Sequence, residues 1–156
     1  MRKRVGMHLS APTEGCYGEP GEAQRLAFER RVQSMELGAV HADDTSELLT
    51  SGLWRRYRNR AHTVLDEIAR DPDSLAPVYP GAGLRWCEVT YVKQHEMGTH
   101  LKDLLRRRSK ILLLKPRELF TDSEVTRTLC EVLFETDAKM RYQAFLDEIR
   151  LQDDEL

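Results

Sequence analysis

A chain of 156 residues can bury one continuous hydrophobic core and leaves little room for a second domain. Charged residues make up 32% of the chain and aromatic residues only 7%, which favours amphipathic helices over a β-sandwich. The formal net charge of −2 gives no general attraction to nucleic-acid backbones, so a role of that kind would need local basic clusters.

The N-terminal residues 1–20 are rich in proline and glycine and predict a linker or arm rather than a regular element. Arg2-Lys3-Arg4 is similar to the start of a signal peptide, but no apolar stretch follows it. No run approaches the roughly 20 apolar residues that span a bilayer. The cysteines are odd in number and far apart, which indicates neither a disulfide framework nor a zinc knuckle. We therefore expect a cytoplasmic protein.

Apolar residues recur at helical spacing from residue 21 onward. Residues 21–37 predict a first helix, and Gly38 stands where a C-terminal cap belongs. Residues 53–70 predict a second helix with one apolar stripe, which the Asp71-Pro72 pair ends. Prolines and glycines between residues 77 and 83 predict a loop.

The second half of the chain predicts further helices. Residues 86–112 form a long helical region with an expected break near Gly98-Thr99, and Pro116 ends it. Thr121-Asp122-Ser123-Glu124 has the spacing of a capping box at the start of another helix. A last helix is expected to begin near Thr136-Asp137, with Tyr142, Phe145 and Ile149 facing inward, before an acidic tail at residues 152–156.

Together these segments predict an all-α fold. We expect a compact orthogonal bundle of about five helices over residues 21–151, with an irregular N-terminal arm.

Few residues of this chain have a spacing that suggests catalysis. His95 and His100 lie five positions apart, so on one unbroken helix their rings would point roughly 140° apart, and no third zinc ligand is in sight. Gly-x-Gly-x-x-Gly and Gly-x-Ser-x-Gly motifs are both absent from the sequence. Cys87 and Cys130 lie on apolar helix faces, where cysteine is usually a small buried hydrophobe. We therefore assign no catalytic residue, no cofactor site and no metal ligand.

Two arginine clusters, residues 55–60 and 106–110, are the strongest local concentrations of positive charge. Consecutive arginines spread around a helix instead of lining one face, and Asp103 precedes Arg107 by four residues, an orientation favourable for an ion pair. We interpret the clusters as solvated faces and ion pairs. Nucleic-acid binding through them stays the alternative.

The most informative stretch of the chain holds Glu88-Val89, Tyr91, His95-Glu96-Met97, Leu101, Asp103, Leu105 and Arg107-Arg108. These residues match the block Ala-Glu-Val-x-Tyr-Ala-Val-x-His-Glu-Met-Ala-x-Thr-Leu-x-Asp-Val-Leu-x-Arg-Arg-Thr-Arg. That block is found in the C-terminal helical domain of FAD-dependent glycerol-3-phosphate dehydrogenases and oxidases, which the chain resembles from about Leu48 to Leu146. Residues Val125 to Phe145 resemble the last two helices of that domain. Upstream, Leu53, Tyr57, Ala61 and Val64-Leu65 are similar to the family's Leu-x-x-x-Tyr-Gly-x-x-Ala-x-x-Val-Leu, with Arg58 in place of the glycine. Further departures are Cys87, Gly98, His100 and Lys110.

The family oxidises sn-glycerol 3-phosphate to dihydroxyacetone phosphate and passes hydride to FAD. The resemblance therefore implies a helical cap or accessory domain that packs on an FAD-binding catalytic domain, which this sequence does not contain. It implies no activity and no cofactor in this chain alone, with FAD in the parent enzyme. The candidate interface or structural polar residues are Glu88, His95, Glu96, Asp103, Arg107 and Arg108.

The resemblance also favours a partly buried ion pair between Asp103 and Arg107 or Arg108. It implies a cytoplasmic location, or a peripheral one at the cytoplasmic face of the membrane, with membrane contact only through the parent enzyme. We expect no nucleic acid as partner, and a homo-oligomer stays open. The alternative is a free-standing helical interaction module that binds nucleic acid through its arginine clusters.

Overall fold

The structure, a computed structural model, describes residues 21–40, 47–96, 100–109 and 111–151. The predicted arm, the predicted acidic tail and the expected break at Gly98-Thr99 lie outside these ranges. Within them the chain is all-α, with an isolated β-bridge between Pro77 and Arg85, so the predicted fold class is confirmed.

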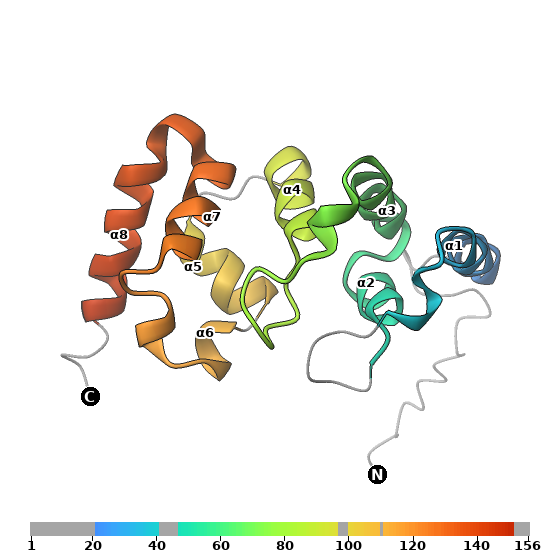
Figure 1. The fold of residues 1–156 in the computed structure, drawn as a ribbon, viewed down its shortest axis with the longest axis horizontal. Coiled ribbons are helices and arrows are strands. Elements are labelled where there is room, and N and C mark those ends of the chain that lie inside the picture. The colour runs from blue at the N-terminus through green and yellow to red at the C-terminus, as the bar shows by residue number, and fades with distance from the viewer. Residues whose placement is uncertain (1–20, 41–46, 97–99, 110, 152–156) are drawn as a thin grey trace, which may run out of the picture.

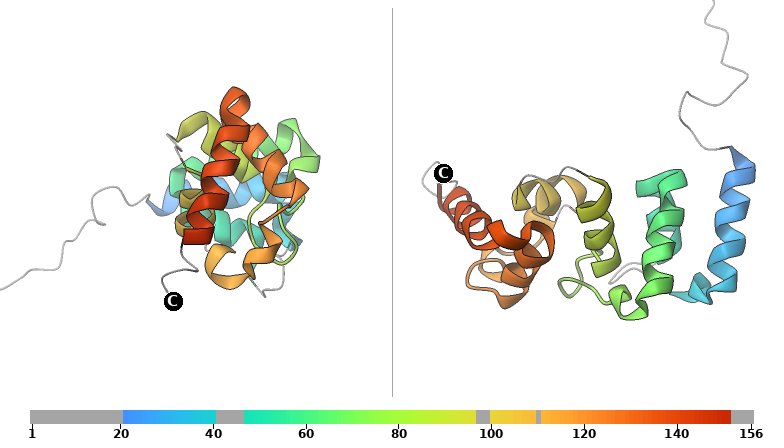
Figure 2. Two further views of the ribbon diagram at one scale, coloured as in Figure 1. Left: turned by 90° about the vertical axis from the view of Figure 1, so that its left-hand side faces the viewer. Right: turned by 90° about the horizontal axis from the view of Figure 1, so that it is seen from above.

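The helices lie side by side along the long axis of the molecule, nearly in chain order, with α1 at one end and α8 at the other (Figure 1). Figure 2 shows the same succession from above. Helix α3 packs against α1, α2 and α4, while α7 packs against α4 and α8. The bounds are α1 Glu22–Ser34, α2 Leu49–Tyr57, α3 Ala61–Arg70, α4 Trp86–His95, α5 Leu101–Asp103, α6 Ile111–Leu114, α7 Glu124–Phe134 and α8 Ala138–Leu151.

Two breaks of the same kind separate consecutive helices. Arg58, with φ 51°, follows α2, and Glu135, with φ 48°, follows α7. A residue at positive φ cannot continue a right-handed helix, and each of the two opens a 3₁₀ turn before the next helix begins. The prediction of one helix over residues 53–70 is therefore wrong. Its apolar stripe continued across the break because α2 and α3 both pack into the same core.

Two predicted helix ends also differ. Helix α1 stops at Ser34, because Glu36 adopts the left-handed conformation there, with φ 57° and ψ 23°. Gly38, predicted as the cap, lies in the next 3₁₀ turn. Helix α7 begins after Ser123, whose Oγ accepts a hydrogen bond from the backbone N–H of Thr126 at 3.4 Å. The predicted capping box would place Thr121 at the N-cap of this helix. The N-cap is Ser123 instead, so the prediction is wrong by two residues.

The predicted helical region 86–112 is also interrupted. Helix α4 ends at His95, and α5 runs into a π-helical turn at Leu104–Arg108. The backbone N–H of Ser109 donates to the carbonyl of Leu104 at 3.0 Å, five residues back. The hydroxyl of Ser109 donates to the carbonyls of Leu104 and Leu105. Pro116 ends the region after α6, as predicted.

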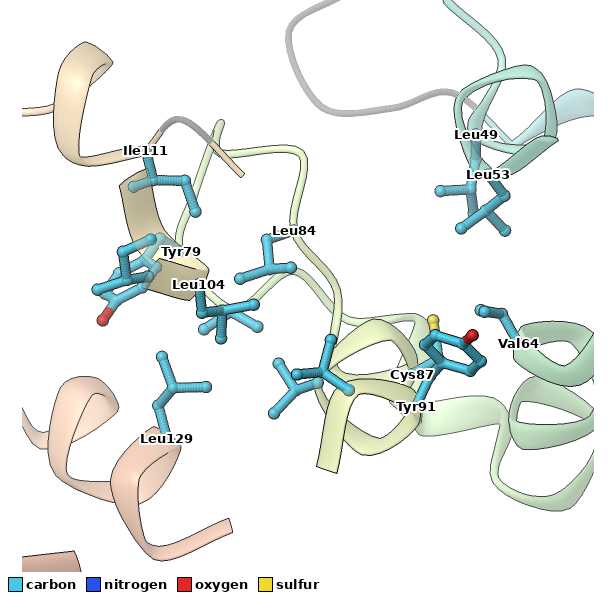
Figure 3. Packing of buried hydrophobic residues seen from close by; sticks show 14 of the residues in the cluster. Leu49, Leu53, Val64, Tyr79, Leu84, Cys87, Tyr91, Leu104, Ile111 and Leu129 are labelled. Carbon is cyan, nitrogen blue, oxygen red and sulfur yellow. The ribbon is translucent and has the colours of Figure 1, made fainter. Parts of the chain in front are cut away.

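One hydrophobic core runs through all these elements. Figure 3 shows it extending from Leu49, Leu53, Val64, Cys87 and Tyr91 to Leu84, Tyr79, Leu104, Ile111 and Leu129. The loop after α3 enters this core, and the hydroxyls of its Tyr79 and of Thr126 on α7 are hydrogen-bonded at 2.9 Å. Cys87 and Cys130 are buried as predicted, and burial raises the pKa of their thiols to about 12 and about 11. Phe145 and Ile149 of α8 face inward, also as predicted.

Candidate functional site

Glu88 on α4 is the centre of a buried polar network. Its side chain is 1% exposed, and its Oε1 lies 2.8 Å from Nη2 of Arg56 on α2. The hydroxyl of Tyr57 donates to the same Oε1 at 3.1 Å, and the backbone N–H of Arg85 donates to Oε2 at 3.2 Å. The carboxyl group of Glu88 therefore joins α2 to the start of α4 and also caps α4.

Burial controls the protonation of this network. It raises the pKa of Glu88, although Arg56 and the hydrogen bonds from Tyr57 and Arg85 act in the opposite direction. Burial, followed by the charge of Glu88, raises the pKa of Tyr57 well above its ordinary value. Tyr57 therefore stays protonated throughout the physiological pH range, and its hydroxyl donates a hydrogen bond to the carboxyl group of Glu88.

A row of rings leads from this network to the end of α4. The rings of Tyr57 and Tyr91 meet edge to face with centroids 5.0 Å apart, and the Tyr91 and His95 rings do so at 4.9 Å. Glu96 follows at the end of the helix and contributes to the raised pKa of Tyr57. The structure thus brings together three of the predicted polar residues, Glu88, His95 and Glu96.

Sequence reasoning missed Arg56 and Tyr57 as the partners of Glu88. Tyr57 stood in a segment similar to the family, which was a signal for its importance. Arg56 stood in an arginine cluster, where nothing in the sequence distinguished it from Arg55. Arg55 instead pairs with Glu47 at 2.9 Å on the surface. Since both arginines are engaged within the chain, the structure favours the ion-pair interpretation for these two residues of the cluster.

Asp103 and Arg107 belong to a second polar group, on the surface. They contribute to a hollow of about 650 Å³ formed by α5, the π-helical turn and α8. Its lining residues are His100, Lys102, Asp103, Arg106, Arg107 and Glu148, and we call it the charged hollow. Lys102 Nζ lies 3.5 Å from Glu148 Oε2, which links α5 to α8.

The ion pair between Asp103 and Arg107 is exposed to solvent. Arg107 Nε lies 3.2 Å from Asp103 Oδ1, and the two side chains are 79% and 47% exposed. The expectation of a partly buried pair is therefore wrong for Arg107, since the turn of chain that carries it faces outward. The side chain of Arg108 lies outside the part of the structure that is described.

The described residues contain no group of three His, Cys, Asp or Glu side chains that could hold a metal ion. His95 contacts Tyr91, whereas His100 lines the charged hollow. Within the same ranges, no helix is both long and apolar enough to cross a membrane.

Fold and site together define an all-α domain with a buried polar network around Glu88 and a charged hollow on its surface. Residues 21–139 match the family model for the C-terminal domain of alpha-glycerophosphate oxidase, and the chain belongs to this family. The resemblance seen in the sequence is thus confirmed. Neither the curated proteins nor the solved structures include a significant match to the chain.

Proposed function

We propose that this domain packs on the flavin- and substrate-binding domain of an FAD-dependent glycerol-3-phosphate dehydrogenase or oxidase, as its helical cap or accessory domain. The observation that carries the proposal is the family match over residues 21–139. In such an enzyme the catalytic domain holds the FAD and oxidises glycerol 3-phosphate. The helical domain supplies a rigid surface and no reacting group.

The structure of the domain supports this role. Glu88 and Tyr57, which match the family's pattern, are used inside the fold to hold α2 against α4. Asp103 and Arg107, which match it as well, face solvent and are available to a partner. The domain therefore combines a stiff interior with a polar surface that its own packing leaves uncovered.

The native polypeptide that carries this sequence tests the proposal. We expect that the protein purified from its own cells contains FAD and oxidises glycerol 3-phosphate with an artificial electron acceptor. The flavin domain would belong either to the same polypeptide or to a tightly bound second chain. The 156-residue chain alone should be colourless and inactive. Mass spectrometry of the native material identifies which polypeptide holds the flavin. Native protein that purifies to homogeneity without flavin would contradict the proposal.

A further inference from the structure

The charged hollow carries more positive than negative charge. Lys102, Arg106 and Arg107 line it, against the carboxylates of Asp103 and Glu148. Each carboxylate already has a basic neighbour, because Lys102 lies near Glu148 and Arg107 near Asp103. Arg106 forms no ion pair within the described residues and is exposed. The hollow can therefore accept a further carboxylate group.

The ion pair in the hollow adds little to the stability of the domain itself. An exposed pair such as Asp103 and Arg107 contributes at most about 1 kcal/mol. Yet both positions match the most family-like segment of the chain. Glu88, in the same segment, differs because it ties two helices together inside the core. A contact outside the described residues would explain why Asp and Arg stand at these surface positions.

The π-helical turn sets the geometry of the hollow. It buries Leu104 and Leu105 and leaves Arg106 and Arg107 exposed. Turns of this kind are rare and often occur at functional positions. Here the backbone N–H of Ser109 donates a hydrogen bond to the carbonyl of Leu104, and its hydroxyl donates to the carbonyls of Leu104 and Leu105. These hydrogen bonds stabilise the irregular turn. Two adjacent guanidinium groups are thus presented on a supported stretch of backbone.

We propose that the charged hollow is the place where the flavin domain docks, and that it receives a carboxylate-bearing segment of that domain. The inference rests on the proposed function. Guanidinium groups bind carboxylates through paired hydrogen bonds in a fixed geometry, which suits Arg106 and Arg107 to this partner. Asp103 orients Arg107, and a volume of about 650 Å³ can admit several side chains of one segment.

The test uses the native flavoprotein and the double variant Arg106→Glu/Arg107→Glu. The matched control is Arg60→Glu/Arg150→Glu, which makes the same charge change at exposed positions outside the hollow. If the domains are separate chains, we expect the hollow variant to weaken their affinity about tenfold or more. If they share one polypeptide, the hollow variant should release FAD at a lower temperature. The control should stay close to the wild type in both cases.

Two further measurements keep the test decisive. Circular dichroism melting of each 156-residue variant checks that it still folds, and the milder Arg107→Gln replaces any variant that does not. The wild-type association should also weaken as salt is added, because its contacts are charged. A hollow variant that behaves like the control overturns this inference while the proposed function stands. Wild-type protein without a flavin-bearing part overturns the proposed function instead.

Discussion

Arg55 and Arg56 are neighbours in the sequence but differ in what they contact. Arg56 pairs with the carboxyl group of Glu88, which is almost fully buried, while the side chain of Arg56 itself is 29% exposed. Arg55 forms an ion pair with Glu47 at the surface. A buried charge that loses its partner must be desolvated alone or take up a proton, whereas an exposed one is solvated by water.

We therefore predict that Arg56→Ala lowers the free energy of unfolding by about 2 to 3 kcal/mol, and Arg55→Ala by less than about 1 kcal/mol. Urea denaturation of the two variants and the wild type at neutral pH measures both values. Equal losses for the two arginines would show that Glu88 does not depend on Arg56.

Glu88 also predicts a dependence of stability on pH. Because burial raises its pKa, the folded protein keeps the proton of Glu88 at pH values where the unfolded chain has lost it. The contribution of Glu88 is therefore greatest below the unfolded pKa of about 4.5 and declines as the pH rises toward the folded pKa.

Glu88→Gln removes this titration. We predict that the stability of the wild type relative to Glu88→Gln falls as the pH rises above 4.5, by at most about 1.4 kcal/mol per pH unit within that window. Urea midpoints of both proteins across the pH range measure the difference. A difference that grows with pH would mean that the attraction of Arg56 outweighs the burial of Glu88.

A residue at positive φ separates α2 from α3, and another separates α7 from α8. Arg58 and Glu135 both adopt positive φ, which places strain on any residue with a Cβ atom. Arg58 combines φ 51° with ψ −128°, a conformation that glycine adopts readily, and the family resemblance has glycine at that position. Arg60, two residues later, has φ −73° and ψ −11°, where glycine brings no relief.

We predict that Arg58→Gly stabilises the protein by about 1 kcal/mol and that Arg60→Gly destabilises it by about 0.5 to 1 kcal/mol. Thermal and urea denaturation of the two variants supply the comparison. Destabilisation by both would indicate that the side chain of Arg58 contributes more than the strain costs.

At the scale of the whole molecule, the helices form a row that shares one core. Leu105 is fully buried in the middle of this core, while Leu114 is 76% exposed, only nine residues along the chain. Since α3, α4 and α7 contact one another in succession, a cavity in the middle should weaken the entire row.

We predict that Leu105→Ala lowers the free energy of unfolding by about 2 to 5 kcal/mol while unfolding remains a single transition. Leu114→Ala should change it by less than about 0.5 kcal/mol. Melting curves followed by circular dichroism and by tryptophan fluorescence test both expectations, because Trp54 and Trp86 report on α2 and α4. Two separate transitions would show that the row consists of independent parts.

Apolar spacing predicted most of the helices correctly, because residues such as Phe28, Val64 and Phe145 must face a core wherever that core lies. It failed where one residue decides the backbone path. Arg58, Glu36 and Glu135 are ordinary helix residues by composition, yet all three adopt positive φ, which ends the helix before each of them. The stop of α1 before Gly38 has the same cause.

The sequence by itself determined the all-α class and the family, because periodicity, composition and motif spacing are local properties. Only the tertiary structure decided which contacts the predicted polar residues make. Glu88 became a buried partner of Arg56 because side chains at the end of α2 reach the start of α4. Asp103 and Arg107 remained at the surface because the π-helical turn directs its leucines into the core and its arginines outward. These distinctions depend on long-range packing, which spacing along the chain does not encode.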